Sequence, residues 1–498
     1  MTRHRREYFK IHQLRRIYDK NAGKFTFNIA YETAAKLTPR TVAVAEAFGL
    51  GLDQGEKFVI LDNVELKIGP RDVVYITGDS GSGKSVLLRA LQKDLGEEAV
   101  DIASLQINSK SPLIETLGKS IEEALNLLCK VGLNDAFLFL RTYDQLSDGQ
   151  KYRYRIAKLM ESKKQWWVLD EFASTLDRDT AKIVAFNLQK LARENGKAVL
   201  AATTHTDLRE DLHPSVCIHK RFGKEISVEY FSNEPTAECS LVREMEIRPG
   251  LLDDWRRLSG FHYRSHRCGA TREVFCMRRG YELCGVILYN YPPIACFGRN
   301  LVLPKMSVKD LNKNVSIISR IVIHPKYRSI SLGSRLIRDT LAKVGTLYVE
   351  MVAVMARYNP FAEKAGMQRV IFSTPGKEAL KIADVLEGFG FNSKLLGSER
   401  YVIGRLQRLS LKKMAILKQA FKENNHPRLQ RNIGGDRHQP YGTKEAYVQG
   451  INTATLQDMA KLIKVVGMLL QVKAYLFWQR PRNDMAASTL SPASSPEN

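Results

Sequence analysis

The sequence predicts an α/β protein in which a domain built on a parallel sheet is followed by an α+β domain and a basic helical region. Three observations predict this fold class. Strand-forming residues 73–77 lead into a glycine-rich turn, and a helical run, 86–91, follows at once. Two more apolar strands, 166–169 and 198–204, end in polar residues. Beyond residue 236 the pattern changes to a hairpin and later to amphipathic helices.

The glycine-rich turn is predicted to bind phosphate. Its sequence, GDSGSGKS, has the form GxxxxGK[ST] in the required strand, loop and helix context. Glycines let backbone N–H groups and the helix N-terminus face a phosphate, Lys84 adds positive charge, and Ser85 offers a hydroxyl to Mg²⁺. We therefore expect ATP and Mg²⁺ to bind, with nucleotide contacts from Gly78, Asp79, Ser80, Gly81, Ser82, Gly83, Lys84 and Ser85.

The composition predicts a soluble, cytoplasmic protein. Apolar residues make up 44% and charged residues 26% of the chain, and the basic start, MTRHRREYFK, lacks the apolar core of a secretory signal. The longest apolar region, 462–478, contains Lys464 and Lys473, so we expect a buried or amphipathic helix and no transmembrane segment. Seven cysteines without a CxxC pair indicate reduced thiols and no zinc site.

The net charge of +23 is concentrated in the second half. Residues 1–236 hold 35 basic and 32 acidic side chains, whereas residues 237–498 hold 41 and 21. A basic excess of this size attracts polyanions, so nucleic acid is the leading candidate partner. The alternative is a lysine-rich surface that serves solubility.

Further motifs follow the phosphate-binding loop along the chain. They are Gln106, then LSDGQ (Leu146, Ser147, Asp148, Gly149 and Gln150), VLDE ending in Asp170 and Glu171, STLD ending in Asp177, and His205 at a strand end. This series resembles the ATPase domain of the ATP-binding-cassette (ABC) superfamily: Walker A, a weaker Q-loop, the signature loop, Walker B with the catalytic glutamate, the D-loop and the switch histidine. The order makes the resemblance specific, with 23 positions from Ser147 to Asp170 and 35 from Asp170 to His205.

The resemblance implies residue roles. Asp170 and Ser85 help to hold Mg²⁺, while Glu171 and His205 are the catalytic candidates. Glu171 would polarise the attacking water and His205 would contact the γ-phosphate, which is the positioning and charge neutralisation that phosphoryl transfer requires.

The resemblance also implies a sandwich dimer, because the signature loop of one ABC subunit completes the phosphate site of the other. This chain has one Walker A and one signature loop, so we expect a homodimer in preference to a different ABC partner. A transporter role is less favoured, because only 63 positions separate Lys84 from Ser147 and the chain carries a second domain.

In the second half, a β-branched strand over 316–324 leads into the segment HPKYRSISLGSRLIRDTLAKVG. This segment resembles the coenzyme A loop of the GNAT superfamily of N-acetyltransferases, in which Arg or Gln, two residues, Gly, one residue and Gly or Ala precede a helix. Arg328, Ser331 and Gly333 occupy those positions, and Ser331 departs from the pattern. The resemblance implies that acetyl-CoA binds at Ile323, Arg328, Ser329, Ile330, Ser331, Leu332, Gly333, Ser334 and Asn359.

The acyl-transfer candidates are Glu350, on a predicted strand over 347–352, and Tyr358, before a helix predicted near 357–367. His262, Tyr263 and Glu363 are further candidates for a base. The alternative for each is a structural role. The cluster FHYRSHRC, 261–268, either binds a base or a phosphate or is an ordinary loop.

Five regions follow from these patterns. They are a basic N-terminal arm, 1–40, whose first 20 residues contact phosphates or pack as a helix; an ABC-type ATPase domain, 41–236; a GNAT-like domain, 237–405; a basic helical region, 406–480; and a disordered tail, 481–498. We also expect strands within 41–68, a strand over 240–247, a helix over 251–260, and a last helix that begins with a capping box at Thr455 and Asp458 and reaches Phe477.

Two function classes remain open at this point. In the first, an ATP-driven dimer positions an acetyltransferase on nucleic acid. In the second, the chain is a mechanical or regulatory nucleic-acid-stimulated ATPase whose GNAT-like part only binds. An ATP-binding transporter subunit is third.

Overall fold

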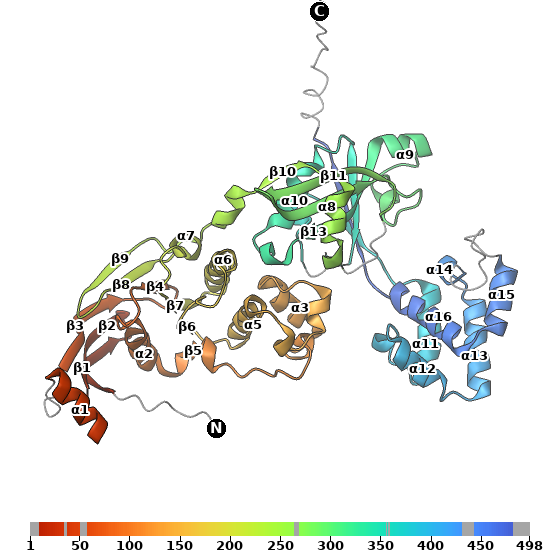
Figure 1. Cartoon of the computed structure of the whole chain (residues 1–498). Helices are drawn as coiled ribbons and strands as arrows, with labels where there is room; N and C mark the ends of the chain where they lie inside the picture. The colour runs from red at the N-terminus through yellow and green to blue at the C-terminus, as the bar shows by residue number, and fades with distance from the viewer. Residues whose placement is uncertain are drawn as a thin grey trace, which may run out of the picture. The chain divides into compact units, whose positions relative to one another are not determined.

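The computed structural model describes residues 9–33, 37–49, 57–262, 268–354, 356, 359–430 and 443–481 (Figure 1). The chain divides into two compact units, one of Met1–Leu288 with Arg320–Thr340 and one of Tyr289–Ser319 with Leu341–Asn498. Within the described ranges, no helix is long and apolar enough to cross a membrane.

The nucleotide-binding domain is built on a six-stranded sheet in the order β5-β6-β7-β4-β8-β9. The five strands from β5 to β8 pair in parallel, and β9 is antiparallel to β8. Every residue of β4, β6 and β7 is buried, as expected for apolar strands covered on both faces. The strands are β4 (Val73–Thr77), β5 (Ala99–Asp101), β6 (Trp166–Leu169), β7 (Ala198–Ala202), β8 (Val216–Lys220) and β9 (Ile226–Tyr230).

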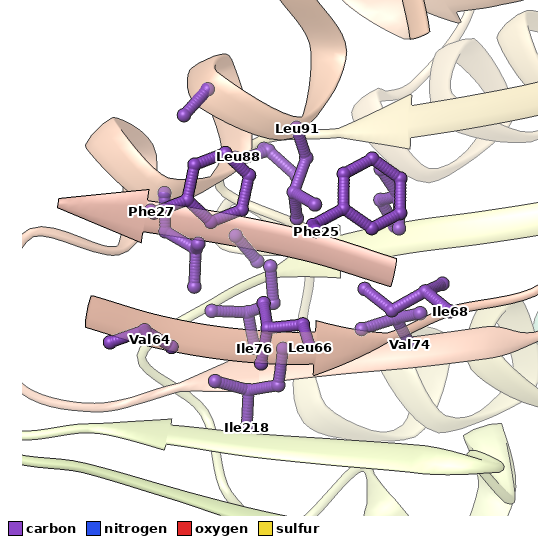
Figure 2. Close-up of a cluster of buried hydrophobic side chains, with 14 of the residues drawn as sticks. Phe25, Phe27, Val64, Leu66, Ile68, Val74, Ile76, Leu88, Leu91 and Ile218 are labelled. Carbon is purple, nitrogen blue, oxygen red and sulfur yellow. The ribbon is translucent and has the colours of Figure 1, made fainter. Parts of the chain in front are cut away.

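The N-terminal region forms strands, so a helix, one of the two expectations for residues 1–20, was wrong for their described part. An antiparallel sheet joins β1 (Phe9–Asp19), β2 (Lys24–Thr33) and β3 (Lys57–Lys67). In Figure 2, side chains of β2 and β3 lie in one apolar cluster with those of β4, β8 and α2 (Lys84–Leu95), the helix that follows β4. Alternating apolar residues such as Phe25 and Phe27 supply one buried face of the strand, which explains why this segment is a strand.

The helices of this domain agree closely with the sequence patterns, with one exception. The helix predicted over 178–194 is α6 (Arg178–Glu194). Residues 42–44, expected in a strand, lie in α1 (Pro39–Phe48), where Pro39 occupies the first turn and Thr38 caps the N-terminus. The remaining helices are α2 (Lys84–Leu95), α3 (Ile121–Lys130), α4 (Ala136–Phe139), α5 (Asp148–Glu161) and α7 (Arg209–Leu212).

A second, seven-stranded sheet has the order β10-β11-β12-β13-β14-β16-β15. Residues 240–244, expected in a strand, form a 3-10 helix before β10. The predicted hairpin is β11 and β12, and the helix expected over 251–260 is α8. The elements are β10 (Glu246–Pro249), α8 (Leu252–Leu258), β11 (Thr271–Arg279), β12 (Glu282–Asn290), α9 (Val308–Asn314), β13 (Val315–Ile323), α10 (Leu332–Leu341), β14 (Tyr348–Ala353), β15 (Gln368–Phe372) and β16 (Ala474–Gln479).

The C-terminal segment corrects two expectations. The last helix, α16 (Leu456–Leu469), begins with the predicted Thr455–Asp458 capping box but does not reach Phe477. Residues 474–479 instead form β16, which pairs antiparallel with both β14 and β15. Because a strand with two partners has its backbone hydrogen bonds satisfied, this apolar stretch suits a central strand as well as a helix.

A helical segment is therefore inserted in sequence between β15 and β16. Its helices share one apolar core, so the predicted division at 405/406 separates residues that pack together. The helices are α11 (Lys377–Gly388), α12 (Glu399–Leu406), α13 (Leu411–Glu423), α14 (Pro427–Gln430), α15 (Lys444–Thr453) and α16.

Candidate nucleotide-binding site

A cavity of about 520 Å³ lies at the carboxyl ends of β4, β6 and β7. The parallel strands bring their ends to one edge of the sheet, so residues far apart in sequence meet there. The walls include the phosphate-binding loop from Ser80 to Ser85, both acids that follow β6, and residues 202–204 at the end of β7. Most of the nucleotide-binding residues predicted from the sequence are thereby gathered in one place.

The loop conformation depends on its glycines. Gly78, Gly81 and Gly83 have φ angles of 141°, 78° and 100°, in a region that side chains rarely adopt. The loop also folds back on its lysine, because Lys84 Nζ donates hydrogen bonds to the carbonyl oxygens of Gly78 (2.7 Å) and Asp79 (2.6 Å). Burial lowers the pKa of Lys84, while the nearby Asp79 and Asp170 oppose that shift.

The predicted magnesium ligands lie together. Ser85 Oγ donates a 3.0 Å hydrogen bond to Asp170 Oδ1, and the N–H of Glu171 donates to the same oxygen at 3.0 Å. A hydroxyl and a carboxylate at the wall of this cavity are the hard oxygen donors that Mg²⁺ prefers, so this pair fits the ion. Ser82 Oγ is buried with no hydrogen-bond partner in the described structure, which leaves a polar atom available to a phosphate.

Glu171 is exposed at the wall of the cavity. Its φ angle of 48°, and that of Ala173 at 57°, lie in the left-handed region. Non-glycine residues there cost on the order of 1–3 kcal/mol each and concentrate at functional sites. The strained turn after β6 thus presents the carboxylate to the space where a nucleotide would lie.

His205 follows β7 but does not itself line the cavity, which reaches Thr204. Its Nε2 is buried and has no hydrogen-bond partner among the described residues. Burial and the positive charge of Arg178 lower the pKa of His205 below its usual 6.5, so the imidazole is neutral at pH 7. A neutral ring with an unpaired Nε2 fits the predicted phosphate-contacting role.

The signature loop, 146–150, does not line the cavity of its own chain. Ser147 caps α5 with a capping box, in which its Oγ accepts from the N–H of Gln150 and the Gln150 side chain accepts from the N–H of Ser147 at 3.1 Å. Ser147 and Asp148 are exposed. In the D-loop, Asp177 caps α6, and its Oδ1 accepts from the N–H of Thr180 at 3.1 Å.

Aromatic side chains at the cavity wall are the candidates for base stacking, and the sequence analysis did not identify Phe222 as one of them. Phe58, on β3, lines the cavity, whereas Phe48 is exposed and lies elsewhere. Phe222, in the turn between β8 and β9, also lines the cavity and is 77% exposed. The aromatic residue in the turn sequence RFGK is the sequence feature from which Phe222 could have been identified. Gln106 is exposed and outside the cavity wall, so it is not brought to the site here.

The predicted coenzyme A loop follows β13 as expected, but its arginine is already engaged. Arg328 forms an ion pair with Asp135 at 3.2 Å, and Nε of Arg328 donates to the carbonyl of Ile323 at 3.1 Å. Ile330, Leu332 and Ser334 are buried, Ser329, Gly333 and Asn359 are half-buried, and Ser331 is exposed at the start of α10. The helix expected near 357–367 is reduced to a 3-10 turn, Glu363–Ala365.

The acyl-transfer candidates do not meet in a catalytic arrangement. Glu350 is fully buried on β14 and binds the Arg299 guanidinium, with Arg299 Nε 3.0 Å from its Oε2, while the Tyr475 hydroxyl donates to the same oxygen at 3.1 Å. This geometry favours a structural role over a general base. Tyr358 and Tyr263 lie outside the described residues, and His262 packs edge-on against Trp255.

Comparison with known proteins gives relatives that match less than half of the chain. The cytochrome c biogenesis ATP-binding export protein CcmA of Gluconobacter oxydans is 32% identical over 170 residues, which cover 31% of this chain and 77% of that protein. The methionine import ATP-binding protein MetN of Rhizobium etli is 27% identical over 261 residues, covering 44% of this chain and 72% of that protein. The chain spans 64% and 56% of the length of two other methionine import ATP-binding proteins.

Among solved structures, the dimeric post-hydrolysis state of the ATP-binding cassette MJ0796 bound to ADP and Pi is 21% identical, with a TM-score of 0.30, and the match covers 36% of this chain and 93% of that chain. No protein-family model matches the sequence. On the identity and coverage of the cytochrome c biogenesis relative, the chain belongs to the ATP-binding-cassette ATPases, which bind and hydrolyse ATP with Mg²⁺.

Proposed function

We propose that two copies of this chain hydrolyse ATP between their nucleotide-binding domains. The observation that carries the proposal is the cavity in which Lys84, the Ser85–Asp170 pair and Glu171 meet. Ser147 and Asp148 of the signature loop are exposed and do not reach this cavity in their own chain, which supports a contribution to the site of a second copy.

In this scheme the residues divide the work of phosphoryl transfer. Ser85 and Asp170 would hold Mg²⁺, which would supply positive charge to offset the negative charge of the phosphates. Lys84 and the loop N–H groups bind the β and γ phosphates, Glu171 orients and polarises the attacking water, and His205 contacts the γ-phosphate through Nε2.

The test combines hydrolysis with association. Glu171→Gln should bind ATP, lose most of its hydrolysis and accumulate as a dimer by analytical ultracentrifugation, because the sandwich forms but does not turn over. Lys84→Ala should neither hydrolyse ATP nor dimerise with it. Ser147→Arg should bind ATP but remain monomeric. Equal hydrolysis by Lys84→Ala and the parent would refute the proposal, and ATP-bound monomers of Glu171→Gln would refute the dimer.

Nucleic acid is the partner that the charge distribution supports, because the excess of basic side chains lies in residues 237–498. All seven cysteines are free thiols, which fits a reducing compartment such as the cytoplasm. RNA or DNA should stimulate hydrolysis at low salt, and the effect should fall as salt rises. Stimulation that is absent at every salt concentration would remove nucleic acid as the partner.

Acetyl transfer is a second candidate function, supported by the segment from β13 to α10. The pairing of β13 with β14 ends at Ile318↔Met351, whereas β13 continues to Ile323. The end of β13 that precedes the predicted coenzyme A loop is therefore not paired with β14. Ser329 and Ser331 have φ angles of 78° and 63°, as in a loop whose N–H groups turn toward an anion. Incubation with labelled acetyl-CoA, ATP and cellular RNA, DNA and protein should label one fraction. If hydrolysis proceeds without label, the GNAT-like part is a binding module.

A transporter subunit is third, supported only by relatives named as import and export ATP-binding proteins.

A further inference from the structure

The loop between β13 and α10, residues 324–331, is held by side chains of the nucleotide-binding domain. Arg153, on α5, is 6% exposed, and its Nη2 donates to the carbonyl of Lys326 at 3.0 Å, while its Nη1 is 3.5 Å from the carbonyl of Pro325. Burial, with the charge of Arg328, lowers the pKa of Arg153 to about 10, so its guanidinium stays charged at neutral pH. A buried charge that binds two loop carbonyls is a strong local restraint.

The middle of the loop is held from two sides. Asp135, which caps α4, forms the ion pair with Arg328, and both side chains are about one-tenth exposed. Asn187, on α6, donates from Nδ2 to Ser329 Oγ at 2.7 Å. Gly132 leaves the space for this contact, because a Cβ there would lie 2.7 Å from Ser329 Oγ.

The start of the loop is held by an acid of α6. Asp179 forms ion pairs with Lys326 (2.6 Å) and with Arg279 of β11 (2.7 Å). Burial alone would raise the pKa of Asp179, but the hydrogen bonds from the two cations lower it below its usual value. These contacts come from residues 100 or more positions away in the sequence.

One of the two helices that hold the loop begins at the signature loop, which completes the partner's site in the proposed dimer, and the other begins at the D-loop. Ser147, of the signature loop, caps α5, which carries Arg153, and Asp177, of the D-loop, caps α6, which carries Asp179 and Asn187. The helices approach closely at these ends, because a Cβ on Gly149 would lie 3.0 Å from Thr180 Cγ2. A displacement of either helix N-terminus would therefore move a helix whose side chains hydrogen-bond to residues 324–331.

We propose that ATP-driven dimerisation releases the 324–331 loop from Asp135, Arg153, Asp179 and Asn187. This inference rests on the proposed ATP sandwich. The loop is strained, because Ser329 and Ser331 hold positive φ angles, which residues other than glycine keep only under restraint. Docking of the signature loop on a partner's nucleotide would move α5 and, through the close approach of Gly149 to Thr180, α6, and contacts of 2.6–3.2 Å do not tolerate such a shift.

Release has a consequence for the attached domain. While Arg328 is paired with Asp135, its guanidinium is committed to a carboxylate and is withheld from any other anion. Arg328 would then be available to another anion only in the ATP-bound dimer. Binding of ATP would thus control anion binding in the second half of the chain.

The test is hydrogen–deuterium exchange of the peptide spanning 325–334 in full-length Glu171→Gln, with and without ATP and Mg²⁺, together with ATP binding on the same sample. We expect exchange to be about tenfold faster with ATP, the effect of losing one charged hydrogen bond. Binding of ATP with unchanged or slower exchange overturns this inference and leaves the proposed function intact. Failure to bind ATP overturns both.

Loop variants test the contacts independently of nucleotide. Asp135→Asn and Asn187→Ala should raise exchange of the same peptide without ATP. The matched control is Glu210→Gln, which removes a 2.7 Å ion pair with Arg243 away from the loop and should leave exchange slow. Equal exchange in all three variants would also overturn the inference.

Discussion

The carbonyl oxygen of Lys220 occupies the space that a side chain on Gly78 would need, with only 1.9 Å between that oxygen and a Cβ built on the glycine. The same lysine is fully buried, and its ammonium donates hydrogen bonds to the carbonyls of Arg221 (2.7 Å), Gly223 and Glu225 (3.4 Å). The last residue of β8 thus packs against the phosphate-binding loop and organises the turn that carries Phe222.

Lys220→Met should weaken both the fold and ATP binding. Loss of the ammonium removes the donor to the turn carbonyls of Arg221 and Gly223, while the carbonyl of Glu225 keeps the N–H of Arg221, so we expect stability to fall by about 2 kcal/mol and the KM for ATP to rise. Thermal unfolding and steady-state hydrolysis measure the two effects. Lys224→Met, which removes an exposed ion pair with Asp62, is the control and should change neither. An unchanged KM in Lys220→Met would contradict the positioning role.

Phe222→Ala should raise the KM for ATP by at least about fivefold with little change in kcat, because stacking of a base on an aromatic ring contributes about 1–3 kcal/mol and acts on binding. Phe58→Ala should do the same, because both rings line the cavity. The control is Phe48→Ala, which removes an exposed ring outside the cavity. A loss confined to kcat, or the same loss in the control, would show that Phe222 does not contact the nucleotide.

Arg178→Gln should raise the pKa of His205 toward 6.5. Burial and Arg178 both disfavour the imidazolium, so His205 favours the folded state above pH 6.5 and loses that contribution as pH falls through its lowered pKa. The variant removes one of the two causes. NMR of ¹³C-labelled histidine against pH measures the shift, and Arg209→Gln, which removes an exposed pair with Glu229, should leave the His205 titration in place. A fall in the His205 pKa of Arg178→Gln would contradict the assigned cause.

Arg299→Met should destabilise the second unit by about 3–5 kcal/mol, because it leaves the fully buried Glu350 without its cation. Chemical denaturation measures the loss. The double variant Arg299→Met with Glu350→Leu should recover much of it, since neither charge is then buried alone. If Glu350→Gln abolished acetyl transfer while stability stayed unchanged, Glu350 would be a base after all.

Local patterns predicted much of the nucleotide-binding domain because its motifs act through neighbours in sequence. The helix at 178–194 starts at an Asp cap and keeps an apolar face, and the loop 78–85 follows its strand directly. The predictions for residues 9–33 and 474–479 were wrong because the structure of these segments depends on residues far away in the sequence. Their strands exist because distant strands supply hydrogen-bond partners, and no local signal distinguishes such a strand from an apolar helix.

The sequence by itself determined the chemistry of the nucleotide site, because lysine, serine, aspartate and glutamate at fixed spacings after buried strands must meet at one sheet edge. Only the tertiary structure decided that Phe222 reaches that cavity, that Glu350 is committed to Arg299, and that Arg328 is held by Asp135. Each of these depends on a contact between segments far apart along the chain, and the free energy of such contacts is set by packing and burial that no local pattern encodes.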